Sequence, residues 1–196
     1  MLLRRPSKRL RVALDPIKGS RFIATLDRAV DEDAAMDVVK GLRSEWPDAT
    51  HHVFAWRIDP DSRRASDDGE PAGTSGPPIL RRLDSAEASQ TVIVVTRFYG
   101  GTKLGSGGLV RAYGQAASAA LEEVEWVEEA QTHKLMLSCS YSQEGPLRGL
   151  LSRFDAEVTT ARWDTQVHLE ILVPIELEET LKLELQELGA GSIQVD

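Results

Sequence analysis

The sequence predicts an α+β fold in two domains, residues 1–125 and 126–196. Short alternating or β-branched runs, typical of strands, are interleaved with segments whose apolar residues recur every three or four positions, as in helices. The apolar residue fraction of 41% is large enough to build a core in a chain of 196 residues. Near Trp126 the composition turns acidic and the pattern of elements starts again, so the domain boundary is placed there.

The first domain is expected to contain four strands and three helices. The β-branched run from Thr91 to Arg97 predicts a central strand that is buried on both faces. Asp31 is a suitable N-cap for a helix that Pro47 ends. The polar stretch Asp59–Gly76 has no periodicity, so a long loop is expected there. The predicted strands are 9–15, 20–27, 51–58 and 91–97, and the predicted helices are 32–46, 77–89 and 108–121.

The second domain has the predicted element order β-α-β-β-α-β, which is that of a ferredoxin-like module. Ser142 is the expected N-cap of its first helix, and Gly189 is expected to end its second helix. Cys139 falls within its first strand, where a small buried apolar residue is expected. The predicted strands are 134–141, 157–162, 166–173 and 192–195, and the predicted helices are 145–154 and 174–188.

Charge is distributed unevenly between the two domains. Residues 1–125 hold 18 Lys or Arg and 18 Asp or Glu, whereas residues 126–196 hold 5 and 13. The whole net charge of −8 therefore lies in the second domain, which would repel a polyanion. Any nucleic-acid binding is thus expected in the first domain. A basic terminal arm, interpreted as a frayed end, contains Arg4, Arg5, Lys8, Arg9 and Arg11.

Cysteine content and hydropathy favour a cytoplasmic location. Cys139 is the one cysteine, so neither a disulfide within the chain nor a multi-cysteine metal site can form. A reducing compartment is consistent with this. The first residues are basic but no apolar segment follows them, so a signal peptide is not expected. No window approaches 18 uninterrupted apolar residues, and interaction with a membrane is therefore not expected.

A glycine-rich segment after the predicted central strand is the most distinctive feature of the sequence. Glycines let backbone N–H groups approach a ligand closely, and the following helix adds free N–H groups and partial positive charge. Arg97, Lys103 and Arg111 would add charge, while Tyr99 and Tyr113 could stack on a ring. The glycines are Gly100, Gly101, Gly105, Gly107 and Gly108. Together these residues predict an anion-binding site.

This segment matches neither of the standard phosphate-binding fingerprints. A P-loop requires a lysine and then a serine or threonine after its second glycine, but Ser106 and Gly107 follow Gly105. A Rossmann fingerprint requires a third glycine where this chain has Val110. An alternative interpretation is that the glycines only permit a tight connection between strand and helix.

The segment Asp67–Gly76 is a second candidate, because it contains the three carboxylates Asp67, Asp68 and Glu70. Such a loop could hold a divalent cation through oxygen ligands, but its spacing is not that of an EF-hand. Neither a metal nor any other cofactor is expected. A further possibility is that Asp68 or Glu70 pairs with Arg97 or Arg111 across a cleft, which would make these residues structural.

Histidines and nucleophile-type residues give weaker signals. His51 and His52 are adjacent on a predicted strand and should point to opposite faces, so one would line the cleft and the other would be in the core. Ser75, Ser106 and Cys139 are nucleophile types, but no sequence signature pairs them with a base. No catalytic residue is therefore assigned.

Four segments of the chain carry a family resemblance. They are Lys18–Ile23, Asp48–His52 with Ala55–Trp56, Ser66–Pro77, and Arg97–Gly114. They resemble the successive motifs of the YigZ/IMPACT family, in the family's order and spacing across residues 8–121. The last two segments are long and specific. The second domain is similar in element order to the small second domain of bacterial YigZ proteins.

The resemblance implies a fold and a general role. The first domain should have the fold of the second domain of a small-subunit ribosomal protein, a sheet with helices packed on one face. The second should resemble ferredoxin-like domains of elongation factor G. Both of those proteins work on RNA or the ribosome, which suggests a role linked to translation.

The resemblance carries no partner or catalytic residue over to this chain. Eukaryotic IMPACT proteins are similar only in the first domain, and they act by protein contacts in the starvation-sensing pathway that restrains initiation. Those contacts are not carried over, because the RWD-type domain of the eukaryotic proteins is not expected here. The family offers no catalytic residue assignment to transfer.

Three functional hypotheses follow. The leading one is a non-enzymatic, translation-linked protein that contacts RNA or the ribosome through a cleft containing Lys18, Arg21, His51, Arg97, Lys103 and Arg111. The second is an enzyme for a small phosphorylated or carboxylated metabolite in the same cleft, with Asp68 or Glu70 as acid or base. The third is a protein-interaction adaptor that docks through its acidic second domain.

Overall fold

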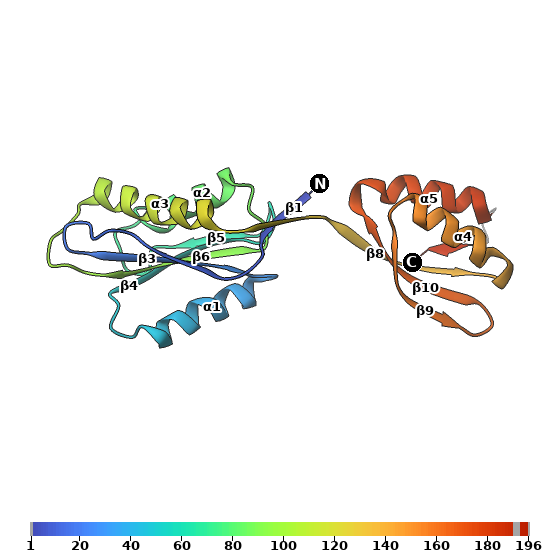
Figure 1. Cartoon of the computed structure of the whole chain (residues 1–196), viewed down its shortest axis with the longest axis horizontal. Helices are drawn as coiled ribbons and strands as arrows, with labels where there is room; N and C mark the ends of the chain where they lie inside the picture. The colour runs from blue at the N-terminus through green and yellow to red at the C-terminus, as the bar shows by residue number, and fades with distance from the viewer. Residues whose placement is uncertain (1, 190–192, 196) are drawn as a thin grey trace. The chain divides into compact units, whose positions relative to one another are not determined.

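The computed structural model describes residues 2–189 and 193–195, and in these ranges the chain forms five helices and three sheets (Figure 1). The chain folds into two compact units. The first consists of residues Leu3–Glu128, and the second begins at Glu129. The predicted α+β class is confirmed. Within the described ranges, no helix combines the length and the apolar character needed to cross a membrane.

The first unit is built around a five-stranded antiparallel sheet with the strand order β2-β3-β6-β4-β5. The strands are β2 (Leu10–Ala13), β3 (Arg21–Arg28), β4 (His51–Arg57), β5 (Arg63–Ser66) and β6 (Thr91–Phe98). The helices are α1 (Glu32–Glu45), α2 (Gly76–Ser85) and α3 (Ser106–Glu123). The strand β6 is central and every residue of it except Phe98 is buried, as its β-branched sequence predicts.

Helices cover both faces of this sheet (Figure 1). On one face α2 and α3 pack on Ile93 and Val95 of β6. On the other face α1 packs on Val92 and Val94, which alternate with them along the same strand. The expectation that the helices would lie on one face is therefore corrected. The physical reason is that β4 and β6 present apolar residues on both sides, so each side needs a cover.

The residues of α1 and its neighbours explain the second layer. Asp31 caps the helix, since its carboxylate accepts a hydrogen bond from the backbone N–H of Ala34 at 2.8 Å. The buried face of α1 consists of Ala35, Val39 and Leu42. It packs near Phe54 and Trp56 of β4, whose rings are stacked with centroids 5.3 Å apart.

The second unit has the predicted order β-α-β-β-α-β, and its sheet has the strand order β11-β8-β10-β9. Its elements are β8 (Thr132–Cys139), α4 (Tyr141–Arg153), β9 (Glu157–Trp163), β10 (Val167–Pro174), α5 (Ile175–Gly189) and β11 (Gln194–Val195). Alternate residues of β10, from Val167 to Val173, pack under α4 and α5 in one apolar core. Cys139 is a free thiol in this core, and burial raises its pKa. The predicted start of the last strand, Ser192, lies outside the described residues.

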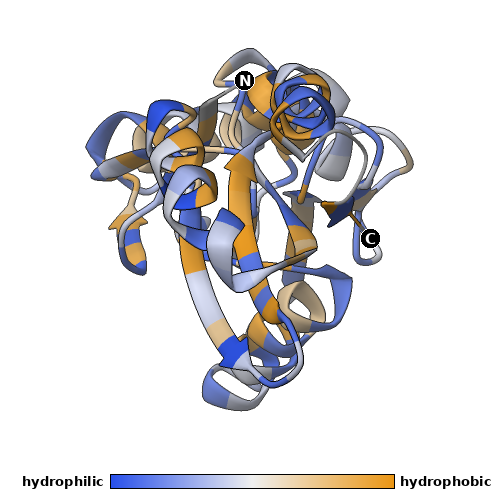
Figure 2. Cartoon of the chain, turned by 90° about the vertical axis from the view of Figure 1, so that its right-hand side faces the viewer, coloured by the Kyte–Doolittle hydropathy of each residue, from blue (hydrophilic) through white to orange (hydrophobic). Residues whose placement is uncertain are grey.

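Hydropathy follows this layered arrangement. In Figure 2 the hydrophobic colour runs along the strands and alternates around the helices, whereas most connecting turns are hydrophilic. This is the pattern expected when each helix turns one apolar stripe toward a sheet.

Three short strands were not predicted: β1 (Leu2–Pro6), β5 and β7 (Trp126–Ala130). The strand β5 lies inside the segment expected to be a loop and pairs with β4. The strand β1 pairs with β7, so the basic arm is not a frayed end.

Arg4 shows how the arm is held. Its guanidinium lies 4.5 Å from the centroid of the Trp126 ring and donates a hydrogen bond to the carbonyl of Ala86 at 2.9 Å. Its own carbonyl accepts a hydrogen bond from Ser89 N–H at 2.7 Å.

The N-cap of α4 differs from the prediction by two residues. The helix begins at Tyr141, and Ser140 rather than Ser142 forms a capping box with Gln143. The Gln143 Oε1 atom accepts hydrogen bonds from Ser140 N–H at 3.1 Å and from Ser140 Oγ–H at 2.7 Å. Two serines with similar capping propensity stand close together, and the sequence alone does not separate them.

We predict that Ser140→Ala lowers the free energy of unfolding by about 1 kcal/mol, because it removes the capping side chain of α4. The matched control is Ser142→Ala, which should change stability by less than half as much. Urea denaturation followed by circular dichroism measures both. Equal losses for the two variants would contradict the assigned cap.

Candidate functional site

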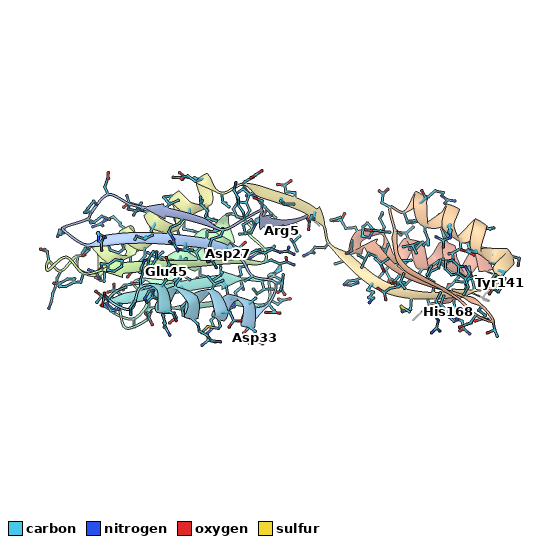
Figure 3. The ribbon with its side chains drawn as sticks, turned by 60° about the horizontal axis from the view of Figure 1, so that its bottom comes forward. Arg5, Asp27, Asp33, Glu45, Tyr141 and His168 are labelled. Atoms are coloured by element: carbon cyan, nitrogen blue, oxygen red, sulfur yellow. The ribbon has the colours of Figure 1, made fainter. Side chains whose placement is uncertain are left out.

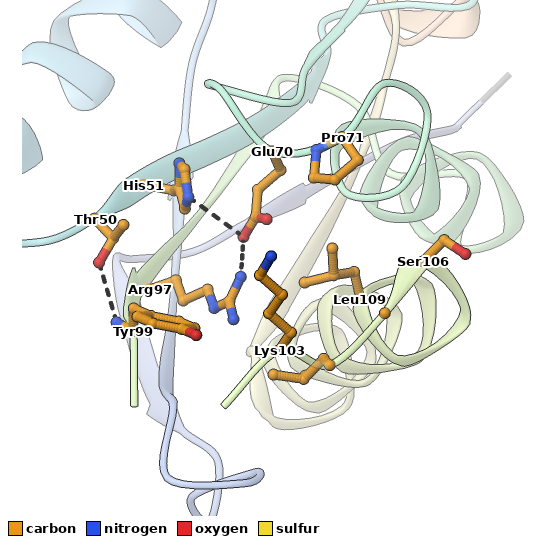
Figure 4. Close-up of a pocket in the computed structure, with 11 residues that line it drawn as sticks. Thr50, His51, Glu70, Pro71, Arg97, Tyr99, Lys103, Ser106 and Leu109 are labelled. Atoms are coloured by element: carbon orange, nitrogen blue, oxygen red, sulfur yellow. Dashed lines mark hydrogen bonds and ion pairs between the residues drawn. The ribbon is translucent and has the colours of Figure 1, made fainter. Parts of the chain in front are cut away.

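A pocket of about 450 Å³ opens at the end of β4 and β6, beside the glycine-rich segment (Figure 4). The pocket is where five parts of the first unit meet. They are the start of β4, the segment Asp67–Gly76 (the acidic segment), the end of β6, the glycine-rich segment and the first turn of α3. They are Thr50, His51, Glu70, Pro71, Arg97, Tyr99, Lys103, Leu104, Gly105, Ser106 and Leu109. The volume is within the range of small-molecule sites in proteins.

The floor of the pocket is a buried ion pair between Glu70 and Arg97. Arg97 Nη1 lies 2.5 Å from Glu70 Oε1, and the two side chains are only 5% and 4% exposed. The same Glu70 oxygen accepts a hydrogen bond from the hydroxyl of Tyr113 at 2.7 Å. Arg97 Nη2 donates to Ser20 Oγ at 3.3 Å. The pair thus connects the acidic segment with β6, α3 and the turn before β3.

This pairing decides between two expectations for Arg97. A buried guanidinium already neutralised by a carboxylate is not a free cation for a phosphate group. The hypothesis that Glu70 pairs with Arg97 across the cleft is therefore confirmed, and Arg97 does not act as an exposed anion-binding charge. Tyr113 is fully buried, so the expectation that it stacks on a ligand is wrong. Burial and the neighbouring Glu70 carboxylate raise its pKa, which keeps Tyr113 protonated as a donor.

The two adjacent histidines point to opposite faces of the sheet, as predicted. His51 lines the pocket, and its Nδ1 lies 2.8 Å from the carbonyl oxygen of Asp68. Because a carbonyl only accepts, Nδ1 carries the proton, and Nε2 lies 3.8 Å from Glu70 Oε1. His52 instead lies in the core, between Thr96 and Trp46, and burial lowers its pKa.

The three carboxylates of the acidic segment have different roles. Asp67 accepts hydrogen bonds from the backbone N–H groups of Gly73, Ser75 and Gly76 at 2.8–2.9 Å. Burial acts to raise the pKa of Asp67, but these three donors outweigh it and lower the pKa below the ordinary value. Asp67 therefore stabilises the turn of this segment. It also accepts the hydrogen bonds of the N–H groups at the start of α2, where the side chain of the N-cap residue Ser75 caps no N–H group.

Asp68 is also committed to the fold. Its two oxygens accept hydrogen bonds from Arg43 Nη2 at 2.5 Å and from the backbone N–H of His52 at 2.6 Å. Of the three carboxylates, Glu70 is the one that lines the pocket. Across the described residues no cluster of three or more His, Cys, Asp or Glu side chains is arranged to hold a metal ion.

The glycines fall into two groups with different physical requirements. A Cβ atom on Gly100 would lie 1.9 Å from the carbonyl carbon of Gly19, so these two backbones can approach only because both residues are glycines. Gly101 and Gly105 have φ values of +83° and +75°, which also favour glycine. In contrast, Gly107 lies within the first turn of α3 and has room for a side chain.

The N-terminus of α3 lies at the edge of the pocket. Its N-cap, Gly105, has no side chain to accept a hydrogen bond from the first-turn N–H groups. The first helical hydrogen bond joins Leu109 N–H to the Gly105 carbonyl, so the preceding N–H groups are left for a ligand or water. Gly105 and Ser106 line the pocket.

The predicted basic residues are brought together only in part. Lys103 lines the pocket, whereas Lys18 and Arg111 line a neighbouring hollow of about 200 Å³ that shares Leu104 with it. None of these three forms an ion pair with a residue in the described ranges. Tyr99 is 46% exposed at the mouth of the pocket.

Arg21 does not belong to the pocket. Its guanidinium lies 4.4 Å from the centroid of the Phe98 ring, and Phe98 in turn contacts Trp46 at the end of α1. Arg21 therefore lies on the α1 side of the sheet, opposite to the side that carries Arg97 and Phe22. The expectation that Arg21 lines the cleft is corrected, because adjacent strand residues alternate between faces.

Several residues that line or support the pocket were not predicted. Ser20 is fully buried, and its hydroxyl accepts hydrogen bonds from Arg97 and from Gly100 N–H at 3.1 Å. Thr50 Oγ1 accepts one from Tyr99 N–H at 3.0 Å. The apolar side chains of Leu104 and Leu109 complete the wall. The periodicity of α3 gives a signal for Leu109, whereas Ser20 and Thr50 lie within segments that carry the family resemblance, Lys18–Ile23 and Asp48–His52, and have no other sequence signal.

Comparison with known proteins supports the resemblance seen in the motifs. The model of the Impact N-terminal domain matches residues 18–121, and a domain of unknown function, DUF1949, matches residues 137–192. The IMPACT family member YigZ of Escherichia coli is 35% identical over 93% of this chain and 91% of its own length. This chain belongs to the IMPACT family.

Other IMPACT family members share different parts of the chain. YvyE of Bacillus subtilis is 34% identical over 80% of this chain and 73% of its own length. The Protein IMPACT homolog of Saccharomyces cerevisiae is 32% identical over 47% of this chain and 39% of its own length. A solved structure described as a hypothetical protein has a TM-score of 0.72 and 34% identity, and covers 99% of this chain and 96% of its own.

The second unit of this IMPACT family protein contains a further group of three hydrogen-bonded side chains. Ser138 Oγ lies 2.8 Å from His168 Nδ1, and His168 Nε2 lies 3.1 Å from Asp164 Oδ1. The contact was not predicted, since 26 residues or more separate Ser138 from the other two. Ser138 and His168 are directly paired residues on β8 and β10, so strand register alone explains why their side chains meet.

We predict that Gly100→Ala lowers the free energy of unfolding by about 1–3 kcal/mol, because the new Cβ atom would collide with the backbone of Gly19. The matched control is Gly107→Ala, whose Cβ would lie 3.7 Å from Arg111 Nη1 and which should be neutral or slightly stabilising. Urea denaturation midpoints compare the two. A neutral Gly100→Ala variant would disprove the close contact.

We also predict that Arg97→Met lowers the free energy of unfolding by about 3–5 kcal/mol, since it leaves Glu70 buried without its partner. The double variant Arg97→Met/Glu70→Gln should be more stable than the single one, because the uncompensated charge is then removed. The control Arg9→Met breaks the more exposed pair with Asp27 and should cost about 1 kcal/mol or less. Additive effects of the two pocket substitutions would contradict the pairing.

Proposed function

We propose that this IMPACT family protein is a non-enzymatic, translation-linked binding protein that contacts RNA or a ribosomal surface through the pocket side of its first unit. The observation that carries the proposal is the group of exposed, unpaired cations beside the glycine-rich segment. They are Lys18, Lys103 and Arg111. Phosphate groups are recognised by such cations together with free backbone N–H groups.

The pattern of ion pairs supports the proposal that a domain without net charge binds a polyanion. Several other arginines of the first unit are engaged by carboxylates, including Arg9 with Asp27 and Arg11 with Glu45. Figure 3 shows Glu45 and Asp27 among the side chains of this unit. Lys18, Lys103 and Arg111 have no such partner among the described residues and lie near the start of α3, so a positive local field is expected there although the total charge is zero.

The acidic second domain favours the same assignment. Residues 126–196 carry the whole net charge of −8 and would repel a polyanion, so the first domain is the proposed contact. We retain the division into an IMPACT-type domain, 1–125, and a ferredoxin-like domain, 126–196, as part of this proposal. Their likeness to domains of a ribosomal protein and of elongation factor G, and the cytoplasmic location, belong to it as well.

A second candidate function is favoured by one observation, the carboxylate of Glu70 at the floor of the pocket. An enzyme for a small anionic metabolite could use Glu70 as acid or base and the start of α3 to hold the anion. Asp68 is excluded from that role because both of its oxygens are bound by Arg43 and His52. Turnover of such a metabolite by the purified protein, lost in Glu70→Gln, would favour this candidate over the first.

We predict that the triple variant Lys18→Ala/Lys103→Ala/Arg111→Ala binds ribosomes or structured RNA at least tenfold more weakly at low ionic strength. The slope of log affinity against log salt should fall by about one for each phosphate contact that is lost. Filter binding across a salt series measures both quantities. The matched control is Arg21→Ala, an exposed cation on the other side of the sheet, which should bind as the wild type does.

Two outcomes would refute the proposal. One is that the wild-type protein shows no salt-dependent binding to ribosomes or structured RNA at low ionic strength. The other is that the triple variant and Arg21→Ala bind equally well, since the contact would then lie elsewhere.

A further inference from the structure

The free oxygen of Glu70 is the feature of the pocket that the fold does not use. Oε1 is close to Arg97, Tyr113 and His51 at once. Oε2 accepts no hydrogen bond from the residues that the structure describes. It is also not one of their solvent-inaccessible polar atoms that lack a partner, so it is open to the pocket. Figure 4 shows the carboxylate reaching into the pocket with this oxygen directed away from Arg97. A side chain that is 4% exposed thus presents one acceptor to whatever enters.

The wall around this acceptor is largely apolar. Pro71, Leu104 and Leu109 line it, and the half-exposed ring of Tyr99 lies at the mouth. Such a wall suits a flat ring with apolar faces better than a sugar covered by hydroxyl groups. The acceptor at the floor requires that the ring carry an N–H group on its edge, because an ionised carboxylate only accepts.

The rim of the pocket, defined as Lys103 and the first turn of α3, supplies the complementary positive charge. Lys103 forms no ion pair with a described residue, and the first-turn N–H groups of α3 have no side-chain acceptor. The floor does not repel an anion, because Arg97 already neutralises Glu70. The ligand should therefore combine a ring that has an N–H edge with an anionic group a few bonds away.

We propose that the pocket binds a single unstacked nucleotide. Its base lies against Tyr99 with an N–H group donating to Glu70 Oε2, and its phosphate lies at the rim. This inference deepens the proposed function and rests on it for the case in which the nucleotide is part of an RNA strand. A free nucleotide has the same chemistry, so the experiment separates the two sources. Recognition of a splayed base by stacking and edge hydrogen bonds is a common mode of RNA binding.

The test measures binding of the four nucleoside 5′-monophosphates and of an unstructured RNA of eight nucleotides, by calorimetry at low ionic strength. Tyr99→Ala removes the stacking ring at a half-exposed position. The ring also lies 5.4 Å from the Arg97 guanidinium, but the variant keeps the ion pair of Arg97 with Glu70, so folding should be preserved. It should weaken both kinds of ligand about five- to hundredfold. The control Lys18→Ala/Arg111→Ala lies in the neighbouring hollow and should weaken the RNA but leave the monophosphates unchanged.

Glu70→Gln gives a second, independent readout. Arg97 and Tyr113 both donate toward the Oε1 position, so the glutamine carbonyl oxygen should take that place and its NH₂ group should enter the pocket. An acceptor thereby becomes a donor. The ranking of the four monophosphates should change, with bases that present an acceptor edge gaining relative to the others. If this variant does not fold, the Tyr99→Ala result alone decides.

The outcomes separate this inference from the proposed function. Binding of monophosphates but not RNA or ribosomes supports the nucleotide pocket and refutes the RNA role. Binding of RNA that Tyr99→Ala leaves unchanged, with no monophosphate bound, supports the RNA role and refutes the pocket. Inorganic phosphate that binds as tightly as a nucleotide also refutes it, because the site would then recognise an anion only.

Discussion

The buried ion pair between Glu70 and Arg97 is the interaction on which the candidate site of the first unit depends. It joins four segments that are distant in the sequence, since Tyr113 of α3 donates to Glu70 and Ser20 of the turn before β3 accepts from Arg97, although Arg97 Nε is buried without a partner among the described residues. Additional hydrogen bonds of this kind offset part of the cost of removing two charges from water. The geometry of the pair therefore fixes where the acidic segment, the glycine-rich segment and the start of α3 meet, and hence where the pocket lies.

The same constraint divides the charged residues into two functional classes. Asp67 and Asp68 are consumed in folding their own segment, and Arg97 is consumed in neutralising Glu70. What remains available to a ligand is one carboxylate oxygen at the floor and the lysine at the rim. A pocket built this way offers few polar groups in fixed positions within an apolar wall, which is how small-ligand sites obtain specificity.

Sequence reasoning was accurate where a single element carries the information. The central strand β6 follows from an uninterrupted β-branched run, and α1 follows from its cap and its period. The short strand β5, Arg63–Ser66, was missed because polar, largely exposed residues give no pattern; its pairing with β4 defines it. The β-branched run also predicted that β6 is buried on both faces, whereas the arrangement with helices on one face was implied by the family resemblance and is wrong.

The same distinction holds for the candidate site: features carried by one segment were predicted, and features that depend on contacts between segments were not. Glycine density and the acidic cluster marked the two segments that meet at the pocket, and alternation correctly separated His51 from His52. Sequence could not assign the partner of Arg97, because Glu70 and Asp68 are equivalent until the chain is folded. Nor could it place Arg21, whose side of the sheet depends on strand register.

The central claim is that the pocket bounded by Glu70, Arg97 and Tyr99 is where the ligand contacts this protein. Amide chemical-shift mapping by NMR, during titration with a short unstructured RNA at low ionic strength, tests it most directly. The largest shifts are expected on residues 99–109 together with His51 and Glu70. Shifts confined to residues 129–195, or to the α1 side of the sheet around Arg21 and Phe98, would contradict it.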